Sequence, residues 1–426
     1  MATLKAVRGT RDLLPPETPL WNRIEATARA VFARYNFGEI RTPIFEDTAL
    51  FARSVGEETD IVSKEMYTWE DRARAQSERA QSLTLRPENT AGVVRAYIEH
   101  KLGETGQLQK LYYIGPQFRR ERPQKGRYRQ FWQIGAEAIG PPSSGSESPL
   151  RDAEVLEMLG TILDELEIKG WTLEINSVGS TEDRAHYNNV LRAALIPVAP
   201  RMCTDCQRRA VTNPLRVLDC KVPEDQPIIE MLPKIVDSLD EESKAHFAAV
   251  LAALNAAGVP YTRNYRLVRG LDYYTRTTFK FTHGGLGAQN ALLGGGRYDG
   301  LSEALGGPRA PGIGFAIGLD RLVLTLEAQE TVKGEKIEAY IAPLGEALNA
   351  AALVLARELR RAGLRVELGD GSFRLKKSFE TADKAARAIV ILGEDELQSG
   401  ILTVKNFSTG SQSKVPRGRL VNFLKS

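Results

Sequence analysis

The stretch that decides the fold is Phe118-Arg-Arg-Glu-Arg-Pro-Gln-Lys-Gly-Arg-Tyr-Arg-Gln-Phe-Trp-Gln133, which carries six cationic side chains and one carboxylate. Pro123 and Gly126 interrupt it where a chain commonly turns between two strands. The segment therefore predicts an antiparallel hairpin, with one strand over residues 111–121 and a return strand over residues 129–140.

The two faces of this hairpin differ in character, because side chains alternate along a strand. The polar face holds Gln117, Arg119 and Glu121 on the first strand and Arg129, Gln133 and Glu137 on the second. The other face of the return strand is apolar and consists of Trp132, Ile134, Ala136 and Ala138. A planar guanidinium on a rigid strand suits phosphate or carboxylate, although a solvated basic hairpin that binds nothing is the alternative.

Length and composition are those of a globular chain with two or three domains. The 426 residues are 42% hydrophobic and 26% charged. No run approaches the ~18 consecutive apolar residues of a membrane span, and the first residues lack the apolar core of a secretory signal. Three cysteines without the spacing of a disulfide framework favour a reducing compartment. These features predict a cytoplasmic protein.

A change of pattern near residue 333 predicts two domains. Residues 1–330 form the first, with a small, mainly helical insertion at about 179–259. Over 333–426, strands and helices alternate, which predicts a compact α/β module with a mostly parallel sheet. This module has 16 Lys and Arg against 11 Asp and Glu, a surplus that fits a polyanionic partner, although many basic modules bind none.

The first domain opens with a helix and a proline-bearing strand. Apolar residues recur at helical spacing over residues 16–35 and predict a helix. Residues 39–46 follow as a predicted strand, in which Pro43 favours an edge or interface position.

Two later corners place polar side chains between elements. Residues 82–87 are predicted to be extended and to precede a helix that starts near Thr90. Glu88 at this corner either complements the helix N-terminus or faces a ligand amine. Residues 265–281 predict two strands that meet near Gly270, and the tyrosines that follow are either core residues with hydrogen-bonded hydroxyls or ligand groups.

Two glycine-rich segments come next. Gly294-Gly-Gly-Arg-Tyr-Asp-Gly-Leu301 places three glycines where a backbone must approach another strand or a ligand. Residues 312–324 predict a strand that leads into a helix with Arg321 in its first turns. A cation near a helix N-terminus is unfavourable, so Arg321 needs an anionic partner. The chain has no G-x4-G-K-[ST] phosphate loop.

All three cysteines lie in the predicted insertion, as Cys203-Thr-Asp-Cys206 and Cys220. A C-x2-C pair with one distant cysteine lacks a fourth zinc ligand at a suitable spacing, and His186 or His246 would have to be recruited. The pattern therefore favours plain buried thiols over zinc, and no metal site is predicted.

Several of these strings resemble one known family. Residues 118–131 resemble motif 2 of the class II aminoacyl-tRNA synthetases, in the version of the histidyl-tRNA synthetases. Leu85-Arg-Pro-Glu-Asn-Thr90 resembles the amino-acid-binding loop of that family, with Asn89 where the family often has glycine. Arg269-Gly-Leu-Asp-Tyr-Tyr274 resembles a motif specific to it. Less specifically, the helix and strand with Pro43 look like motif 1, and residues 312–324 look like motif 3.

The resemblance implies an α/β fold of the class II synthetase type. Its catalytic domain would contain an antiparallel sheet flanked by helices, and the C-terminal module would be an anticodon-binding-like α/β domain. The implied activity joins L-histidine and ATP into histidyl-adenylate and pyrophosphate and then transfers histidine to the 3′ end of tRNA(His). Mg²⁺ is expected to bridge phosphate oxygens. A homodimer through the region around Pro43 is also implied.

The resemblance also assigns roles to single residues. The proposed catalytic arginines are Arg119 and Arg269, at the α-phosphate and the carboxylate, and Arg321, at the γ-phosphate. Histidine-binding residues are Glu88, Thr90, Arg119, Gln133, Glu137, Arg269, Tyr273 and Tyr274. ATP-binding residues are Arg119, Glu121, Arg127 and Arg321. Gln124 and Lys125 are expected at the acceptor end of tRNA.

Two rival functions are less favoured. A non-catalytic paralogue of this fold is a regulatory subunit of ATP phosphoribosyltransferase in histidine biosynthesis. Such paralogues typically lack the terminal domain and degrade the Arg-Gly-Leu-Asp-Tyr-Tyr string, and this chain keeps both. A synthetase for another amino acid is the second rival, although Glu137 with two tyrosines suits an imidazole better than an aliphatic side chain.

Overall fold

The chain forms two compact units, Met1–Val332 and Lys333–Ser426, each with its own hydrophobic core. The computed structural model describes residues 3–15, 17–56, 59, 61–71, 80–124, 126–268, 273–285, 290–329 and 336–425. The predicted domain boundary at 330–335 lies outside the described residues. None of the helices among the described residues is long and apolar enough to cross a membrane.

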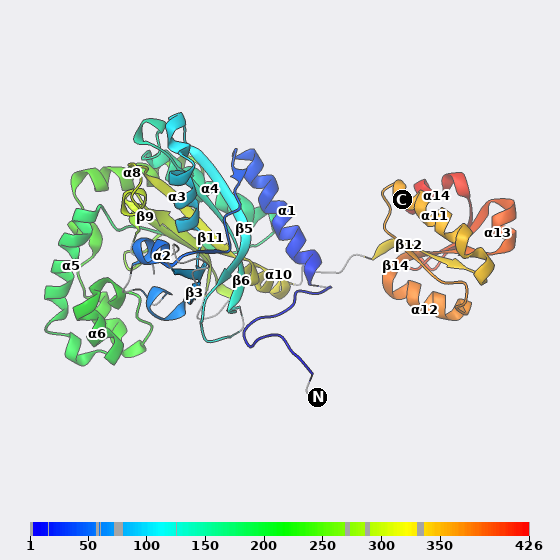
Figure 1. Ribbon diagram of the computed structural model, residues 1–426, viewed down its shortest axis with the longest axis horizontal. Coiled ribbons are helices and arrows are strands. Elements are labelled where there is room, and N and C mark those ends of the chain that lie inside the picture. Colours follow the sequence, from blue (N-terminus) through cyan, green and yellow to red (C-terminus); the bar gives the residue numbers. More distant parts are fainter. Residues whose placement is uncertain are drawn as a thin grey trace. The chain divides into compact units, whose positions relative to one another are not determined.

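The first unit is built on an eight-stranded sheet in the order β1-β5-β6-β11-β10-β9-β7-β8 (Figure 1). Neighbouring strands are antiparallel except at the two edges, where β1 pairs with β5 and β7 with β8 in parallel. The strands are β1 (Gly38–Glu39), β5 (Gln109–Phe118), β6 (Gln130–Ile139), β7 (Trp171–Ser177), β8 (Thr262–Arg263), β9 (Thr275–His283), β10 (Ala291–Arg297) and β11 (Gly312–Gly318).

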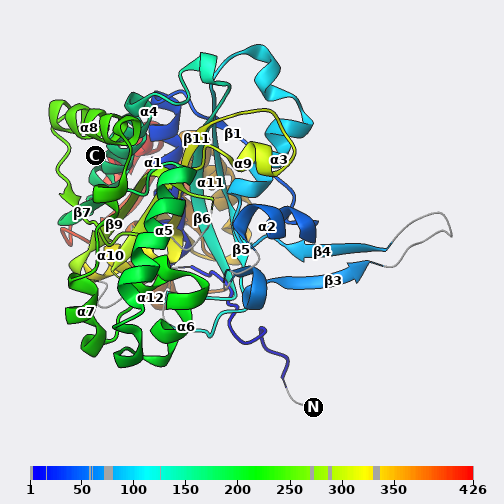
Figure 2. The ribbon, with the colours of Figure 1, turned by 90° about the vertical axis from the view of Figure 1, so that its left-hand side faces the viewer.

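A second, three-stranded sheet has the order β2-β4-β3. Its strands are β2 (Phe45–Asp47), β3 (Tyr67–Asp71) and β4 (Gln81–Leu85). Figure 2 shows β3 and β4 extending side by side away from the body of the unit.

Helices α1, α4, α8 and α10 supply the main core on one face of the large sheet. The helices of the first unit are α1 (Thr18–Arg34), α2 (Thr48–Val55), α3 (Thr90–Glu99), α4 (Pro149–Glu165), α5 (Thr181–Leu195), α6 (Thr204–Thr212), α7 (Gln226–Glu230), α8 (Glu241–Ala256), α9 (Leu301–Ala304) and α10 (Leu319–Ala328). The opposite face of the sheet therefore stays available for a site.

The predicted hairpin is confirmed as β5 and β6, which pair antiparallel with Gly115 opposite Gln133. Its apolar face is confirmed as well, since Ile134, Ala136 and Ala138 are buried in the main core. Trp132 packs edge-on against Trp21 of α1, with the ring centroids 6.5 Å apart. The hydrophobic face of β6 thus fixes which side chains point away from the core.

The predicted strand over residues 39–46 is wrong, because the chain breaks at Pro43 into two short strands in different sheets. β1 pairs with β5, whereas β2 pairs with β4. Between them, the carbonyls of Thr42 and Pro43 accept hydrogen bonds from Arg86 Nη1 at 3.0 and 3.2 Å. Proline has no N–H to donate to a neighbouring strand, and it restricts the conformation of the residue before it. The backbone carbonyls of this stretch are therefore hydrogen-bonded by a buried arginine instead of by a strand.

The predicted pair of strands over residues 265–281 is wrong in its first half. Tyr265 and Arg266 form a turn, in which the Asn264 side chain accepts the N–H of Arg266 at 3.1 Å. The second strand is confirmed as β9. The corner at Gly270 lies outside the described residues.

The segment at 179–259 is mainly helical and contains α5 to α8. From Val178 to Leu239 it has a small core of its own, which includes Tyr187, Leu191 and Cys206. α8 instead packs with α4 in the core of the large sheet. The separate small core therefore ends before α8.

The second unit is a five-stranded sheet in the order β13-β12-β14-β15-β16. Its strands are β12 (Ile337–Pro343), β13 (Val366–Leu368), β14 (Ala386–Leu392), β15 (Ile401–Asn406) and β16 (Gln412–Pro416). Its helices are α11 (Asn349–Arg361), α12 (Leu375–Ala385), α13 (Glu394–Ser399) and α14 (Leu420–Lys425).

The prediction of a mostly parallel sheet in this unit is wrong. β12 pairs in parallel with β13 and β14, but β14–β15 and β15–β16 are antiparallel. The prediction missed β16, which follows β15 through a tight turn. In that turn the Asn406 side chain accepts the N–H groups of Ser408 and Thr409 at 2.8 and 3.1 Å, so a short local motif produced a hairpin.

Candidate active site

A cavity of about 250 Å³ opens on the face of the large sheet that the main core leaves free. Its walls come from segments far apart in the chain: the start of α3, the β5–β6 hairpin, the first half of β10 with Tyr298 just after that strand, and β11 with the first turn of α10. Predicted residues that line it are Glu88, Thr90, Arg119, Glu121, Arg127, Gln133, Tyr273, Tyr274 and Arg321.

Arg119 and Arg321 lie far apart in the sequence, and both line this cavity. Arg119 Nε donates to the Pro87 carbonyl at 2.9 Å, and its guanidinium lies over the Phe131 ring at 5.4 Å. Arg321 Nη1 donates to the Ala291 carbonyl at 2.6 Å. Each arginine is therefore oriented by a backbone carbonyl, and a guanidinium at a cavity wall suits an anionic ligand. Arg269 lies outside the described residues.

Glu121 stands between two arginines at the mouth of the cavity. Its carboxylate lies 3.2 Å from Arg127 and 3.9 Å from Arg119. This side of the cavity therefore carries a negative charge between two positive charges. Gln124, by contrast, does not line the cavity and exchanges backbone hydrogen bonds with Arg127 at 2.9 and 3.1 Å, and Lys125 lies outside the described residues.

Glu88 caps the first turn of α3. Its two carboxylate oxygens accept the N–H groups of Thr90 at 2.8 Å and Ala91 at 3.0 Å. Burial raises the pKa of Glu88, while these N–H groups and the charge of Arg119 oppose the rise. The capping role considered from the sequence is thus present, and Glu88 also lines the cavity.

Glu137 is fully buried on β6, just behind the cavity lining. Thr90 Oγ1 donates to its Oε1 at 2.8 Å, which links β6 to the start of α3. Burial raises the pKa of Glu137 to about 8; the charge of Glu88 adds to this rise, and the hydroxyls of Tyr298 and Thr90 oppose it. This environment therefore favours a neutral carboxyl at Glu137 near pH 7.

Two buried acceptors in this region have no hydrogen-bond partner among the described residues: Gln133 Oε1 and Glu137 Oε2. Unpaired buried oxygens cost free energy, which a ligand with N–H donors would recover. They lie on the same face of β6, four residues apart. The N–H donors that pair with them must therefore belong to two separate groups, either on one elongated ligand or on two ligands.

Aromatic rings form the inner wall. The rings of Tyr273 and Tyr274 lie 4.8 Å apart, and Tyr273 packs edge-on against Tyr298 at 6.1 Å. Burial raises the pKa of Tyr273 well above its usual value, as do the charges around it. The Tyr273 hydroxyl therefore remains protonated and serves as a hydrogen-bonding group rather than as a base.

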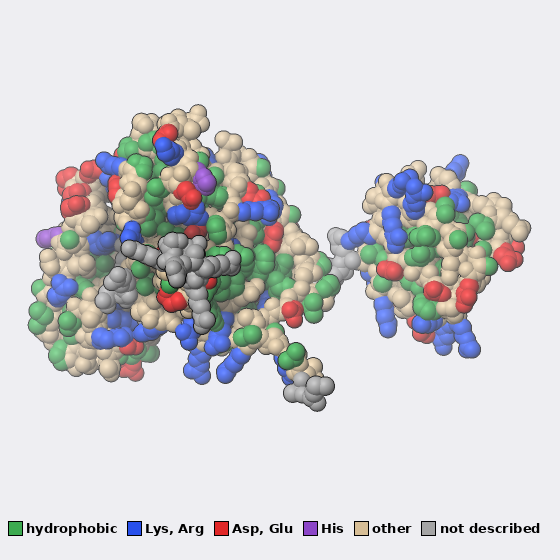
Figure 3. Space-filling model, viewed as in Figure 1, with side chains coloured by type: hydrophobic (Ala, Val, Ile, Leu, Met, Phe, Trp, Pro, Cys, Tyr) green, Lys and Arg blue, Asp and Glu red, His purple; other side chains and the backbone are tan. Residues whose placement is uncertain are grey.

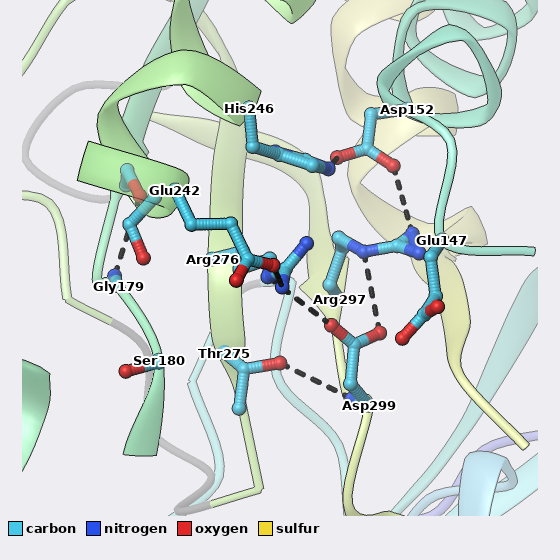
Figure 4. A network of polar contacts seen from close by, with 12 residues as sticks. Glu147, Asp152, Gly179, Ser180, Glu242, His246, Thr275, Arg276, Arg297 and Asp299 are labelled. Atoms are coloured by element: carbon cyan, nitrogen blue, oxygen red, sulfur yellow. Dashed lines mark hydrogen bonds and ion pairs between the residues drawn. The ribbon is translucent and has the colours of Figure 1, made fainter. Parts of the chain in front are cut away.

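Behind this wall, a buried ion network fixes the end of β10 (Figure 4). Arg297 is fully buried and pairs with Asp152 of α4 at 3.0 Å and with Asp299 at 3.2 Å. The N–H of Asp299 donates to Thr275 Oγ1 at 3.1 Å, which joins β10 to β9. Because Tyr298 stands between Arg297 and Asp299, the network holds one wall of the cavity.

His246 of α8 lies on the other side of Asp152, with Nε2 3.7 Å from Oδ2 (Figure 4). Burial lowers the pKa of His246 to about 3, and the charges of Arg297 and Arg276 lower it further. Burial raises the pKa of Asp152 to about 6, against the pull of Arg297. His246 is therefore neutral at pH 7 and belongs to this support, not to a metal site.

Sequence reasoning missed several lining residues. Tyr113 and Phe131 share hairpin faces with Arg119 and Gln133, so the alternation of the strands could have identified them. Asp320 had no such signal: it is held by Arg11, 309 residues away, at 2.8 Å. Only the fold brings that pair to the edge of the cavity.

The chain matches known proteins over its whole length. Residues 9–322 match the histidyl-tRNA synthetase family model, and residues 338–426 match the anticodon binding domain. A histidine–tRNA ligase of Koribacter versatilis is 71% identical over 424 residues, or 99% of this chain and 96% of the relative. One from Solibacter usitatus is 57% identical over 419 residues, or 98% of each.

A solved structure agrees with these matches. The crystal structure of apo S. aureus histidyl-tRNA synthetase has a TM-score of 0.79 and 39% sequence identity, and the match covers 100% of both chains. The fold and the second unit are those of a class II aminoacyl-tRNA synthetase. Within that class, the chain belongs to the histidyl-tRNA synthetase family. The predicted fold class and family are thereby confirmed.

Proposed function

We propose that this protein is a histidine–tRNA ligase, which activates L-histidine with ATP and then transfers it to the 3′ end of tRNA(His). One observation carries the assignment. Two arginines, Arg119 and Arg321, line the same cavity as an unpaired buried acceptor, Gln133 Oε1, directly in front of Glu137. Such a cavity accepts a polyanion and an amine-bearing ligand side by side.

The activation step needs positioning more than proton transfer. The histidine carboxylate attacks the α-phosphate of ATP, a P–O bond forms, and pyrophosphate leaves. Two anions must therefore meet, so fixed guanidinium groups that neutralise the developing charge supply most of the help. We assign Arg119 to the carboxylate and α-phosphate, together with Arg269, and Arg321 to the γ-phosphate.

Glu121 and Arg127 complete the proposed nucleotide side of the cavity. Their ion pair lies in the loop that follows β5. There the positive and the negative side chain can each face a group of opposite charge on the bound nucleotide and its metal ion. ATP brings Mg²⁺, which would bridge its phosphate oxygens. No cluster of three metal-binding side chains occurs at the cavity among the described residues, and this agrees with an ion held mainly by phosphate and water. Glu121 is the carboxylate placed to contact that water shell.

Histidine recognition is assigned to the inner half of the cavity. Gln133 Oε1 is an open acceptor for the α-ammonium group, beside Glu88 and Thr90. Glu137 Oε2 and the two tyrosines, Tyr273 and Tyr274, would read the imidazole, which has one donor and one acceptor when neutral. A buried polar site of this kind rejects analogues that lack the matching groups by a factor on the order of 10⁴.

tRNA is proposed to contact both units. Gln124 lies in the β5–β6 loop, where the acceptor end would approach the cavity, and Lys125, the next residue in the sequence, is assigned the same role. The second unit matches an anticodon binding domain and carries the surplus of Lys and Arg. In Figure 3, these side chains gather at the upper and lower ends of the face shown, which suits contact with phosphates.

The protein is also proposed to form a homodimer and to be cytoplasmic. The chain around Pro43 supplies a short edge strand, β1, of the large sheet, and an edge can pair with a second copy. Light scattering would give twice the monomer mass if this region forms a homodimer. The three cysteines are free thiols, which agrees with a cytoplasmic protein.

One assay tests the proposed function against both rivals: ATP–pyrophosphate exchange across a panel of amino acids. Exchange stimulated by histidine alone supports the ligase. Stimulation by a different amino acid would point to another synthetase, and no exchange with any would point to the regulatory paralogue. The paralogue is not favoured, because the match to ligases at 71% identity covers the whole chain.

A further inference from the structure

We propose that Cys203, Cys206, Cys220 and Asp225 form a tetrahedral zinc site inside the helical insertion. The sulfur atoms and a carboxylate oxygen of these four residues all lie within 4.8 Å of one another. This is the single group of three or more potential metal ligands among the residues that the structure describes. It contains every cysteine of the chain.

The spacing of the ligand atoms fits a metal of the size of zinc. Cys203 Sγ and Cys220 Sγ are 4.0 Å apart, and Cys220 Sγ is 3.3 Å from Asp225 Oδ2. With Zn–S bonds of about 2.3 Å and Zn–O bonds of about 2.1 Å at tetrahedral angles, ligand atoms stand roughly 3.5–3.8 Å apart. Since all the ligand atoms lie within 4.8 Å of one another, shifts of about 1 Å or less would place all four on one ion.

Asp225 is the ligand that the sequence pattern did not provide. It follows Cys220 by five positions, in a short turn just before α7, while Cys203 and Cys206 begin α6. The carboxylate also accepts the backbone N–H of Cys203 at 3.0 Å. This bond joins the segment of Cys203 and Cys206 to the segment of Cys220 and Asp225. Asp225 therefore supplies the fourth ligand, for which the sequence pattern would have required a histidine.

The surroundings of Asp225 argue for a cation. Its side chain is 1% exposed, and no Lys or Arg forms an ion pair with it among the described residues. A buried carboxylate needs a positive partner or several hydrogen bonds, and here the neighbours are a backbone N–H and thiols. Three thiols beside one carboxylate form a donor set that selects zinc over magnesium or calcium.

The loop around the ligands is already shaped for a metal. The N–H of Val222 points at Cys220 Sγ at 3.4 Å, a contact that stabilises a thiolate. Gln226 Nε2 donates to the carbonyls of Cys220 and Val222 at 3.0 and 2.9 Å. These bonds fix the turn that carries Cys220 toward Asp225.

A zinc ion here would fasten the small core of the insertion. That core runs from Val178 to Leu239 and includes both Cys206 and Cys220. It is too small to bury much apolar surface, and small modules of this kind are often stabilised by a structural metal. Four protein ligands leave no open position, so the ion would be structural.

The test is metal analysis of the full-length protein, purified under reducing conditions without a metal-affinity step. We expect about one zinc per chain. Reduced, metal-stripped protein should take up Co²⁺ and give the visible bands of tetrahedral cobalt–thiolate. Cys220→Ser and Asp225→Asn should weaken zinc affinity at least tenfold, as measured by competition with a chromogenic chelator.

Asp205→Asn is the matched control. Asp205 lies between Cys203 and Cys206, but its side chain is 68% exposed and pairs with Arg208, so the variant should bind zinc as the parent does. Less than one zinc per ten chains, together with failure of the reduced parent protein to take up Zn²⁺ or Co²⁺, would overturn the proposal. An equal loss in both aspartate variants would also count against it, because Asp225 would then not be a specific ligand.

Discussion

Gly314 on β11 lies directly opposite Glu137 on β6, and a Cβ atom at Gly314 would stand only 1.6 Å from Glu137 Oε2. The absent side chain thus makes the space that the buried carboxyl group occupies. Gly314→Ala must displace Glu137 or the strand. Because a shift of about 1 Å in a catalytic site costs on the order of 10²-fold, we expect kcat/KM for histidine in ATP–pyrophosphate exchange to fall by about that factor.

Gly300→Ala is the control for this change. A Cβ at Gly300 meets no atom within 4 Å, and its backbone does not have the positive φ that favours glycine. The control should keep the parent rate. If Gly314→Ala also kept it, Glu137 would not take part in histidine recognition.

The hairpin shows what alternation in a sequence can predict. Ile134 and Ala136 were expected in the core and Gln133 and Glu137 on the polar face, and the structure places them so. The pattern was readable because one side of β6 is wholly apolar, which leaves one possible register. Arg129 was expected on the same polar face, but its Nη1 donates to the Arg8 carbonyl at 3.1 Å, and its side chain does not line the cavity.

Contacts between distant segments could not be predicted from the sequence. Asp225 joins the cysteine cluster through a turn with no repeat or spacing signal, and Asp320 is held by Arg11 across 309 positions. Likewise, Pro43 was predicted to favour an edge or interface position in a strand, but nothing in the sequence indicated that the strand would break and that Arg86 would bind the carbonyls of Thr42 and Pro43. Local patterns determined the elements, while long-range hydrogen bonds determined where they ended.

The raised pKa of Glu137, about 8, predicts a specific pH dependence of stability. In the unfolded chain a glutamate has a pKa of about 4.3, so the folded state retains a proton that the unfolded state releases. The stabilisation from Glu137 is complete below pH 4 and is lost as the pH rises to 8, with a slope of at most about 1.4 kcal/mol per pH unit.

Glu137→Gln removes this titration. Urea unfolding between pH 5 and 8 should show the free energy of unfolding of the variant rising relative to that of the parent. Glu303→Gln on exposed α9 should parallel the parent. A constant difference between Glu137→Gln and the parent across this range would mean that Glu137 is already ionised in the folded protein.

Arg321 and Arg119 are predicted to act on the transition state, where charge moves to pyrophosphate. Arg321→Gln and Arg119→Gln should each lower kcat/KM in ATP–pyrophosphate exchange by roughly 10²–10³-fold, the usual loss for a fixed donor to developing charge. Arg122→Gln is the control, since Arg122 belongs to the same loop but is exposed and does not line the cavity. Equal losses in all three variants would show a general effect of removing positive charge rather than specific roles of Arg119 and Arg321.

The buried pair of Arg297 with Asp152 is expected to be worth more to stability than any exposed ion pair nearby. Arg297→Met would leave Asp152 without its cation at a site where Asp152 has no exposure, and removing one partner of a buried pair costs about 3–5 kcal/mol. Arg309→Met, which removes an ion pair from a side chain that is 64% exposed, should cost less than about 1 kcal/mol.

The pH dependence of this loss identifies its cause. If uncompensated charge destabilises Arg297→Met, protonating Asp152, whose pKa is already raised to about 6, should reduce the penalty. The variant should therefore lose less free energy of unfolding at pH 5 than at pH 8. The same loss at both values would mean that Arg297 matters for packing alone. Since Tyr298 is adjacent to Arg297, a rise in KM for histidine is also expected in this variant, because the wall of the cavity loses its support.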